Sequence, residues 1–373
     1  MKYFGLRSSL FLAAAMVSAV PAFAGGITFT CDPSIVADGP TGLCNYLNTT
    51  IAGLYNSTFT NANANVYIEF ANNGGLADST SGFLNTVTYS TYQAALQAES
   101  TDAAKAFVPA GEPGIFGTGD VEITSALAEA LGITTAANGS PIFGLTPGTL
   151  QPDGTTPGVT ACTTYATTGS GCYNGLIQVN IPADLESEIS QGYDYRTLGG
   201  DSTGSTNGNY DFFSVVEHEL DEILGSASCI GLGSGGTSNG CGGGPSAVDL
   251  FRYSSAGVRA YASQTPSTQY FSPDGGVTDT DSATYNTTKA GEDWADFSQG
   301  CQFVQDAEGC PTANNTGSFD ITNDGPGGTA GPEVAIENAV GYNLAAVSTP
   351  EPGTIVLFGA GLAAIGFYRR RRA

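Results

Sequence analysis

The chain reads Val216-Glu217-His218-Glu219-Leu220-Asp221-Glu222-Ile223-Leu224-Gly225 around its single histidine. No glycine or proline interrupts residues 211–224, Asp211 suits the N-cap of a helix, and Gly225 suits its C-terminal cap. The sequence therefore predicts a helix over residues 211–224. Residues four positions apart lie on one face of a helix, so we expect His218 and Glu222 to point the same way.

An imidazole and a carboxylate in this arrangement can both bind zinc. Glu219 follows His218 directly, where its carboxylate could take a proton from a metal-bound water, because zinc brings the pKa of such a water close to neutrality. We therefore predict His218 and Glu222 as metal ligands and Glu219 as the catalytic base. A histidine with carboxylates also suits iron or manganese, so the sequence leaves the metal open.

Acidic residues crowd the same helix, namely Glu217, Glu219, Asp221 and Glu222. Apolar neighbours such as Leu220 indicate that the helix is at least half buried. Buried carboxylates repel one another and lose their hydration, so a packed face cannot hold them all as free anions. A bound cation would relieve this repulsion.

The segment resembles the active-site helix of zincins, His-Glu-x-x-His, with Glu222 in place of the second histidine. Gly225 also matches a glycine that metzincins place after the second ligand. The third histidine of metzincins would fall at Ser228, however, and both methionines, Met1 and Met16, lie near the N-terminus. The metzincin Met-turn is therefore impossible here.

A closer resemblance is to predicted bacterial metalloproteases that carry a C-terminal sorting tail of the PEP-CTERM type and share a His-Glu-x-x-Glu helix. The resemblance implies Asp249 as the third metal ligand, Tyr253 as a catalytic group that stabilises the oxyanion, and Arg252 as a residue that orients Asp249 or Glu222. The matching pieces are Tyr210-Asp211, Asp249-Leu250-Phe251-Arg252-Tyr253-Ser254, Tyr270-Phe271-Ser272, Gly275-Gly276 and Val340-Gly341-Tyr342-Asn343.

The rest of the pattern predicts one α+β domain of zincin type over residues 25–347, with a mixed sheet over the active-site helix. Helical spacing indicates helices at 43–59, 92–106, the later part of 121–131, and 334–342. Strands are expected at 65–70, near 88–90, at 175–180 and at 249–253. The Gly/Pro/Thr-rich stretch 132–173 is predicted as loop, and so is most of 254–331.

The 8 cysteines fall into close couples along the chain. An even number in an exported chain indicates disulfides, and local pairing within each couple is the simplest of the possible connectivities. No Cys-x-x-Cys occurs, which disfavours a zinc-thiolate site. The couples are Cys31 with Cys44, Cys162 with Cys172, Cys229 with Cys241, and Cys301 with Cys310.

The N-terminal residues predict export. Lys2 and Arg7 precede an apolar run from Leu10 to Val20, and Pro21-Ala22-Phe23-Ala24 follows with small residues. These are the parts of a secretory signal peptide, so we predict residues 1–24 as the signal, with cleavage after Ala24.

The C-terminus carries Pro350-Glu351-Pro352, an apolar stretch at about 354–368, and Arg369 to Arg372. The arginines would remain on the cytoplasmic side while the apolar stretch enters the inner membrane transiently. Residues 348–373 resemble the PEP-CTERM sorting signal. This resemblance implies an exosortase-type sorting enzyme as partner and a final place at the cell envelope, the outer surface or the extracellular matrix.

The chain is strongly acidic, with a net charge of −24. Between the two end segments only 5 of the 11 basic residues remain against 34 of the 35 acidic ones, a net charge of −29. Such a surface repels nucleic acid and attracts cations. We therefore expect no nucleic-acid partner.

These features favour an exported zinc-dependent metallopeptidase that hydrolyses proteins or peptides. One alternative is a non-catalytic surface or biofilm-matrix protein whose metal site has degenerated at Glu222. Another is an adhesin or carbohydrate-binding module stabilised by calcium, with Asp279 and Asp281 or Asp320 and Asp324 as oxygen ligands. A serine hydrolase is disfavoured, because Ser202 and Ser238 each lie in a G-x-S-x-G that neither follows a predicted strand nor opens a helix.

Overall fold

The computed structural model describes most of residues 25–345. The signal peptide, the sorting tail, the Cys301–Cys310 couple, Ser202, Ser238, Asp320 and Asp324 lie outside the described residues. Within 25–345 the description omits 73–74, 82–84, 99–118, 147–159, 163–170, 183–191, 196–208, 231–240, 242–243, 262–267, 288–292, 299–302, 308 and 310–330.

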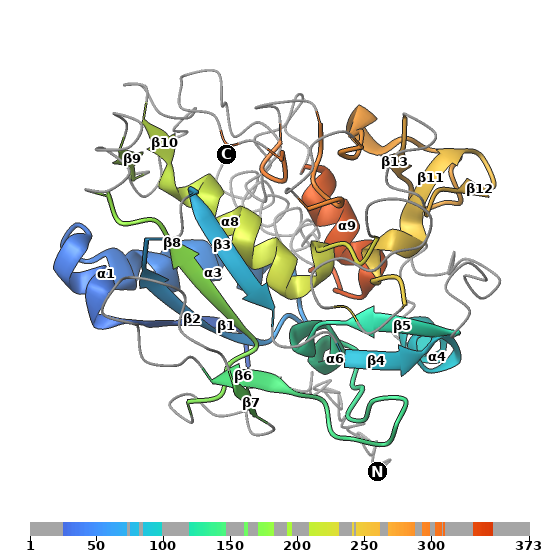
Figure 1. Cartoon of the computed structure of the whole chain (residues 1–373), viewed down its shortest axis with the longest axis horizontal. Helices are drawn as coiled ribbons and strands as arrows, with labels where there is room; N and C mark the ends of the chain where they lie inside the picture. Colours follow the sequence, from blue (N-terminus) through green and yellow to red (C-terminus); the bar gives the residue numbers. More distant parts are fainter. Residues whose placement is uncertain are drawn as a thin grey trace, which may run out of the picture.

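A four-stranded mixed sheet forms the centre of the described chain, in the order β1-β2-β8-β3 (Figure 1). Strands β1 (Ile27–Cys31), β2 (Ala64–Phe70) and β8 (Gly175–Val179) are parallel, and β3 (Ala77–Ser81) runs antiparallel to β8 at the edge. Every residue of β8 is buried, as expected for an inner strand covered on both faces. The strands predicted at 65–70 and 175–180 are therefore confirmed.

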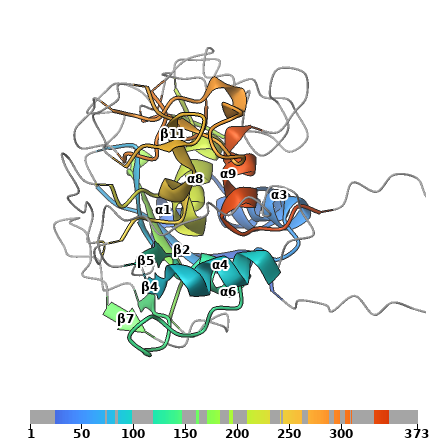
Figure 2. The same cartoon turned by 90° about the vertical axis from the view of Figure 1, so that its right-hand side faces the viewer.

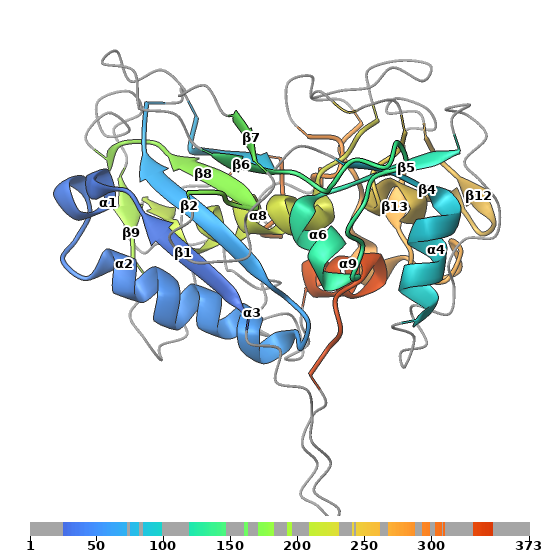
Figure 3. The ribbon, with the colours of Figure 1, turned by 90° about the horizontal axis from the view of Figure 1, so that it is seen from below.

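Two helical segments pack on one face of this sheet. The first is a nearly unbroken helix formed by α2 (Leu43–Tyr46), η1 (Leu47–Ile51) and α3 (Ala52–Thr58), which confirms the helix predicted at 43–59. The second is α8 (Phe212–Asp221), continued by η2 (Glu222–Ser226). Figure 3 shows α3 beside β1 and α8 beside β8.

Gly175 permits the close approach of β8 to η2, since a Cβ at this position would lie 2.4 Å from the Ile223 side chain. Both predicted ends of the continuous helix α8–η2 are present: Asp211 Oδ1 accepts a hydrogen bond from Phe213 N at 3.3 Å, and the helical backbone is broken within η2 at Gly225, whose φ is 142°. The local sequence thus sets the bounds of this helix.

The segments after β3 contain the main departures from the predicted pattern. Strand β4 (Asn85–Thr88) pairs with β5 (Asp120–Ile123), and α4 (Tyr89–Ala98) begins earlier than predicted. Helix α6 (Ser125–Ala130) starts after Thr124, whose side chain accepts a hydrogen bond from Leu127 N. The loop predicted at 132–173 was wrong for β6 (Gly144–Thr146) and β7 (Thr160–Cys162), which pair in antiparallel fashion. Strands of three residues are too short to show periodicity.

The C-terminal part lies on the other side of α8 from the main sheet (Figure 1). It holds a three-stranded antiparallel sheet of β12 (Val258–Arg259), β11 (Arg252–Ser255) and β13 (Tyr270–Phe271). The strand predicted at 249–253 begins only at Arg252, because Val248–Phe251 forms a 3-10 turn, η3.

A pair of short strands precedes α8, and a second 3-10 turn and a helix complete the C-terminal part. Strands β9 (Tyr193–Asp194) and β10 (Tyr210–Asp211) form a parallel pair before α8, and η4 (Thr280–Ser282) is a second 3-10 turn. Helix α9 (Pro332–Val340), predicted at 334–342, packs beside α8 and η2 (Figure 2). The remaining described helix is α1 (Pro33–Asp38), between β1 and α2.

Three of the predicted disulfides are present, Cys31–Cys44, Cys162–Cys172 and Cys229–Cys241. Each joins near neighbours in sequence, with separations of 13, 10 and 12 residues. Such a link reduces the freedom of the unfolded chain and stabilises a fold by about 3 kcal/mol for a loop of this size. The protein is thus a mixed α/β structure with several sheets and local disulfide links.

The acids of α8 divide between two sides of the helix. Glu217 and Asp221 face the core and are 1% and 3% exposed, and Asp221 lies close to Glu333 and Glu337 of α9. Tyr55 OH donates to Asp221 Oδ1 at 2.6 Å, and Ser226 Oγ donates to Glu337 Oε1 at 2.7 Å. Burial raises the pKa of Glu337 well above its ordinary value, and the nearby charge of Asp221 raises it further.

This shift predicts that the fold loses stability as the pH rises. The stability that Glu337 contributes is complete below the ordinary glutamate pKa of about 4.3 and declines as the pH climbs through its raised folded value. Glu337→Gln, which is neutral at every pH, should melt about 3 °C or more above the wild type at pH 8. Thermal melts from pH 5 to 9 measure the effect. The control is Asp38→Asn, an exposed acid with the same charge change; equal pH dependence in wild type and Glu337→Gln would contradict the prediction.

Candidate metal centre

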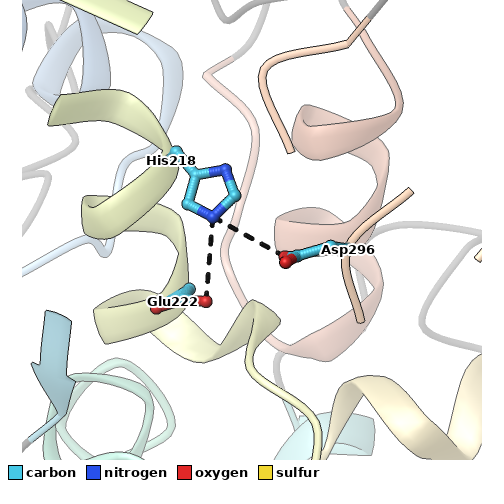
Figure 4. Close-up of side chains that lie close together, drawn as sticks. All are labelled: His218, Glu222 and Asp296. Carbon is cyan, nitrogen blue, oxygen red and sulfur yellow. Dashed lines mark ion pairs between the residues drawn. The ribbon is translucent and has the colours of Figure 1, made fainter. Parts of the chain in front are cut away.

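Three side chains converge beside α8 in an arrangement that could hold a metal ion: His218, Glu222 and Asp296 (Figure 4). His218 Nε2 lies 3.8 Å from Glu222 Oε1 and 3.6 Å from Asp296 Oδ1. Their ligand atoms all lie within 4.8 Å of one another. Tetrahedral zinc ligands at bond lengths of about 2.0–2.1 Å stand roughly 3.3 Å apart, so the two separations from His218 Nε2 lie close to those of ligands that share one ion.

The helix brings the first two of these residues together, as predicted from their spacing. Asp296 comes from the segment 293–298, which follows the strand-like stretch at Tyr285. Asn286 N donates to Asp296 O at 2.6 Å, and Phe297 N donates to Gln305 O at 2.7 Å. Backbone hydrogen bonds therefore hold the Asp296 segment between the segments of Asn286 and Gln305.

Each of the three side chains also has a hydrogen-bond partner behind it. His218 Nδ1 lies 3.0 Å from Val304 O, and a carbonyl can only accept, so Nδ1 carries the proton and Nε2 is left as a ligand. Ser79 Oγ donates to Glu222 Oε2 at 2.5 Å, and Gln305 Nε2 donates to Asp296 Oδ1 at 3.2 Å. Partners of this kind orient metal ligands in proteins.

Glu219 lies on the same side of the helix, next to a cavity of about 320 Å³. Burial raises the pKa of Glu219 well above its ordinary value; Glu222 raises it further, and His218 lowers it. A cation bound beside Glu222 would oppose this rise. Burial by itself lowers the pKa of His218, but the charges of Glu219 and Glu222 outweigh it and leave the pKa above its ordinary value.

The cavity runs from the edge of the main sheet to the C-terminal part. The residues before and at the start of β3 line one side, and Phe303 and Val304 line the other. Tyr210 reaches it from β10. The full lining is Gly75, Leu76, Ala77, Tyr210, Asp211, Ser214, Val215, His218, Glu219, Phe303, Val304, Asp306, Ala307 and Gly309.

The structure does not bring Asp249, predicted as the third ligand, into this group. Asp249 is 1% exposed and both of its carboxylate oxygens accept hydrogen bonds. Oδ1 accepts from Ser228 Oγ at 2.6 Å, and Oδ2 accepts from Cys229 N at 2.9 Å and from Ser246 N at 2.9 Å. Asp249 thus ties together the segments on either side of the glycine-rich stretch, and Asp296 is the acid that lies beside His218 and Glu222.

Two further residues implied by the resemblance also lie elsewhere. Tyr253, predicted as a catalytic group, lies on β11, is hydrogen-bonded to Arg259 and is absent from the cavity lining. Among the described residues Tyr210 is the tyrosine that lines the cavity. Arg252 orients neither Asp249 nor Glu222 by a direct hydrogen bond; its donors point to Gln269, Asn286 and Trp294.

Sequence reasoning missed Asp296. It belongs to Gly291-Glu292-Asp293-Trp294-Ala295-Asp296, where two more acids compete for the role and no spacing relates them to His218. The proposed calcium ligand Asp279 stands just before η4, outside any group of three or more potential ligands that the described residues form. His218, Glu222 and Asp296 are the only such group among the described residues.

A family model for the PEP-CTERM protein-sorting motif matches residues 348–372. The match covers the predicted tail, so the motif is confirmed there; it indicates an exported protein that is sorted to the cell envelope and recognised by an exosortase-type enzyme. No curated protein and no solved structure matches the chain. In the part of the chain that the structure describes, no helix is both long and apolar enough to cross a membrane; the stretch 354–368 lies outside it.

Proposed function

We propose that this protein is an exported zinc-dependent peptidase with a zincin-like catalytic helix. The observation that carries the proposal is the convergence of His218, Glu222 and Asp296 on one point beside a cavity that Glu219 lines. An imidazole and two carboxylates are a donor set suited to zinc, and three protein ligands leave a fourth position for water or substrate.

The surroundings of the three residues fit a metal better than a simple ion pair. His218 Nδ1 donates to Val304 O, which directs Nε2 toward the two carboxylates and makes it the ring nitrogen that would bind a metal. Without a cation, Glu219, Glu222 and Asp296 would place their negative charges around one imidazole in a largely buried site. A divalent ion would balance those charges.

The residues around the site suggest how hydrolysis would proceed. Zinc, when bound, lowers the pKa of a coordinated water toward neutrality and polarises a substrate carbonyl. Glu219 would accept the proton of that water and pass it to the amine that leaves, as a general base and then a general acid. Tyr210, the cavity tyrosine, takes the place first assigned to Tyr253 as a hydrogen-bond donor to the developing oxyanion.

The position of β3 favours an extended peptide as substrate. Strand β3 is one of the two edge strands of the main sheet, the other being β1, and Gly75, Leu76 and Ala77 line the cavity where β3 begins. Extended peptides bind proteins by adding to such edges through backbone hydrogen bonds. A peptide held along β3 would pass beside Glu219 and the metal ligands.

The alternative is a non-catalytic envelope protein in which Glu222 marks a degenerate site. Two observations favour the catalytic proposal over it. Glu222 has its own partner, Ser79, at 2.5 Å, so the carboxylate is held in place as a ligand would be. Glu219 also lines the cavity, so its carboxylate would lie beside a substrate bound there.

Metal analysis of variants tests which side chains bind zinc, and in particular whether the third ligand is Asp296 or Asp249. Purified wild-type protein should hold one zinc per chain, and His218→Ala or Asp296→Ala should lower the zinc affinity by about 100-fold or more, since changes behind the ligands alone cost 10–100-fold. Elemental analysis after dialysis and competition with a chromophoric chelator measure both quantities. Asp38→Asn, which changes an exposed acid on α1, is the control and should keep the zinc affinity of the wild type, whereas Asp249→Asn should lower it less than Asp296→Ala does. Zinc retained by Asp296→Ala but lost by Asp249→Asn would restore Asp249 as the ligand.

Replacement of Glu219, the proposed catalytic base, separates zinc binding from peptide hydrolysis. Glu219→Gln should keep its zinc but hydrolyse an unfolded protein substrate about 10²–10⁴-fold more slowly than the wild type, because the water loses its proton acceptor. Glu217→Gln is the control: it changes an adjacent acid that is 1% exposed and does not line the cavity. Equal rates for the wild type and Glu219→Gln would support the non-catalytic alternative.

A further inference from the structure

Arg252 is an unusual residue in this chain because it is a buried cation in an acidic protein. Its side chain is 1% exposed, and Arg259 is the only other arginine or lysine among the described residues. Burying a guanidinium away from water is costly unless its donors are used and its charge is balanced. Its position therefore requires an explanation from its contacts.

The guanidinium joins three separate segments of the C-terminal part. Nε donates to Gln269 Oε1, Nη1 donates to Trp294 O, and Nη2 donates to Asn286 O at 3.2 Å. Its Cζ atom lies 4.3 Å from the centre of the Tyr285 ring, in a cation–π contact. All three acceptors are neutral, so the contacts fix geometry more than they balance charge.

Two of those acceptors belong to the segments that hold Asp296. Trp294 precedes Asp296 by two residues, and Asn286 N donates to Asp296 O at 2.6 Å. The same loop is tied to the end of the catalytic helix by Asp293, whose Oδ1 accepts from Ala295 N at 2.6 Å and from Ser228 N at 2.9 Å. Arg252 and Asp293 thus fix the Asp296 loop from two sides.

We propose that Arg252 is a positioning residue for the metal centre, which sets the Asp296 carboxylate against His218 and Glu222. The inference rests on the proposed metal site. Asp249 supports this role: its carboxylate lies close enough to act electrostatically on Arg252, as does that of Asp293. Asp249 and Arg252, which the sequence resemblance placed at the metal site, therefore act on that site indirectly, through the loop that carries Asp296.

A guanidinium suits this task better than an ammonium. Its planar fork presents donors in fixed directions, so one side chain can hold the Gln269, Asn286 and Trp294 oxygens at once. Lysine carries the same charge but has a single nitrogen. Arg252→Lys should therefore keep the charge balance with Asp249 and lose most of the geometric control.

A double-mutant cycle tests the role. Arg252→Met should lower the zinc affinity by about 10–100-fold, and it should cause no further loss in the Asp296→Ala background, because the effect passes through Asp296. Chelator competition measures the affinities, and Arg259→Met is the control for loss of an arginine from the neighbouring strand. Should Arg252→Met fail to fold, Arg252→Lys replaces it in the cycle. Unchanged zinc affinity, or the same loss with and without Asp296, would overturn the proposal.

A second readout does not need zinc. His218 is the only histidine of the chain, so its imidazole gives one assignable NMR signal in the metal-free protein. Arg252→Met should move this signal in the same direction as Asp296→Ala, and Arg259→Met should leave it in place. If the wild type binds no zinc and the signal still responds, the peptidase proposal fails while the positioning role stands. An imidazole signal that does not move in Arg252→Met would contradict the positioning role directly.

Discussion

The structure around α8 depends on how buried carboxylates are neutralised. This helix carries acids on two sides, and the described residues offer few cations to balance them. On the core side, Asp221 accepts a hydrogen bond from Tyr55, and Glu337 beside it has a raised pKa that favours its neutral form. On the side that carries His218, Glu222 and Asp296 instead face its imidazole, whose Nδ1 lies 3.0 Å from Val304 O. The charge of the buried carboxylates is thus reduced in two ways. On the core side a raised pKa favours a protonated acid, and on the His218 side the carboxylates form a site suited to a cation.

The parts that depend on local sequence could be predicted. The start of α8 and the break of the helical backbone in η2 follow from Asp211 and Gly225, whose roles need no distant partner. The disulfides pair near neighbours, and the pairing of His218 with Glu222 follows from helix geometry. The export signals are short, continuous stretches of sequence, and the C-terminal one matches the family model for the PEP-CTERM sorting motif.

The third member of the site could not be predicted, because its place is set by long-range contacts. Asp249 lies in a segment that resembles the predicted metalloproteases, but its carboxylate oxygens accept hydrogen bonds from Ser228, Cys229 and Ser246. Asp296 lies in a stretch without regular structure, and its position follows from hydrogen bonds to Asn286 and Gln305 and from the guanidinium behind Trp294. No sequence spacing encodes that arrangement. The short pair β6 and β7 was missed for a similar reason, since its partners meet only in the folded chain.

The central claim is that one divalent metal ion sits between the catalytic helix and the Asp296 loop. Anomalous diffraction at the zinc absorption edge, from crystals of the zinc-loaded protein, tests it most directly. The account predicts one strong peak within about 2.0–2.2 Å of His218 Nε2 and of a carboxylate oxygen from each of Glu222 and Asp296. A peak that lies elsewhere, for example beside Asp249, or no peak at this position in zinc-saturated crystals, would contradict it.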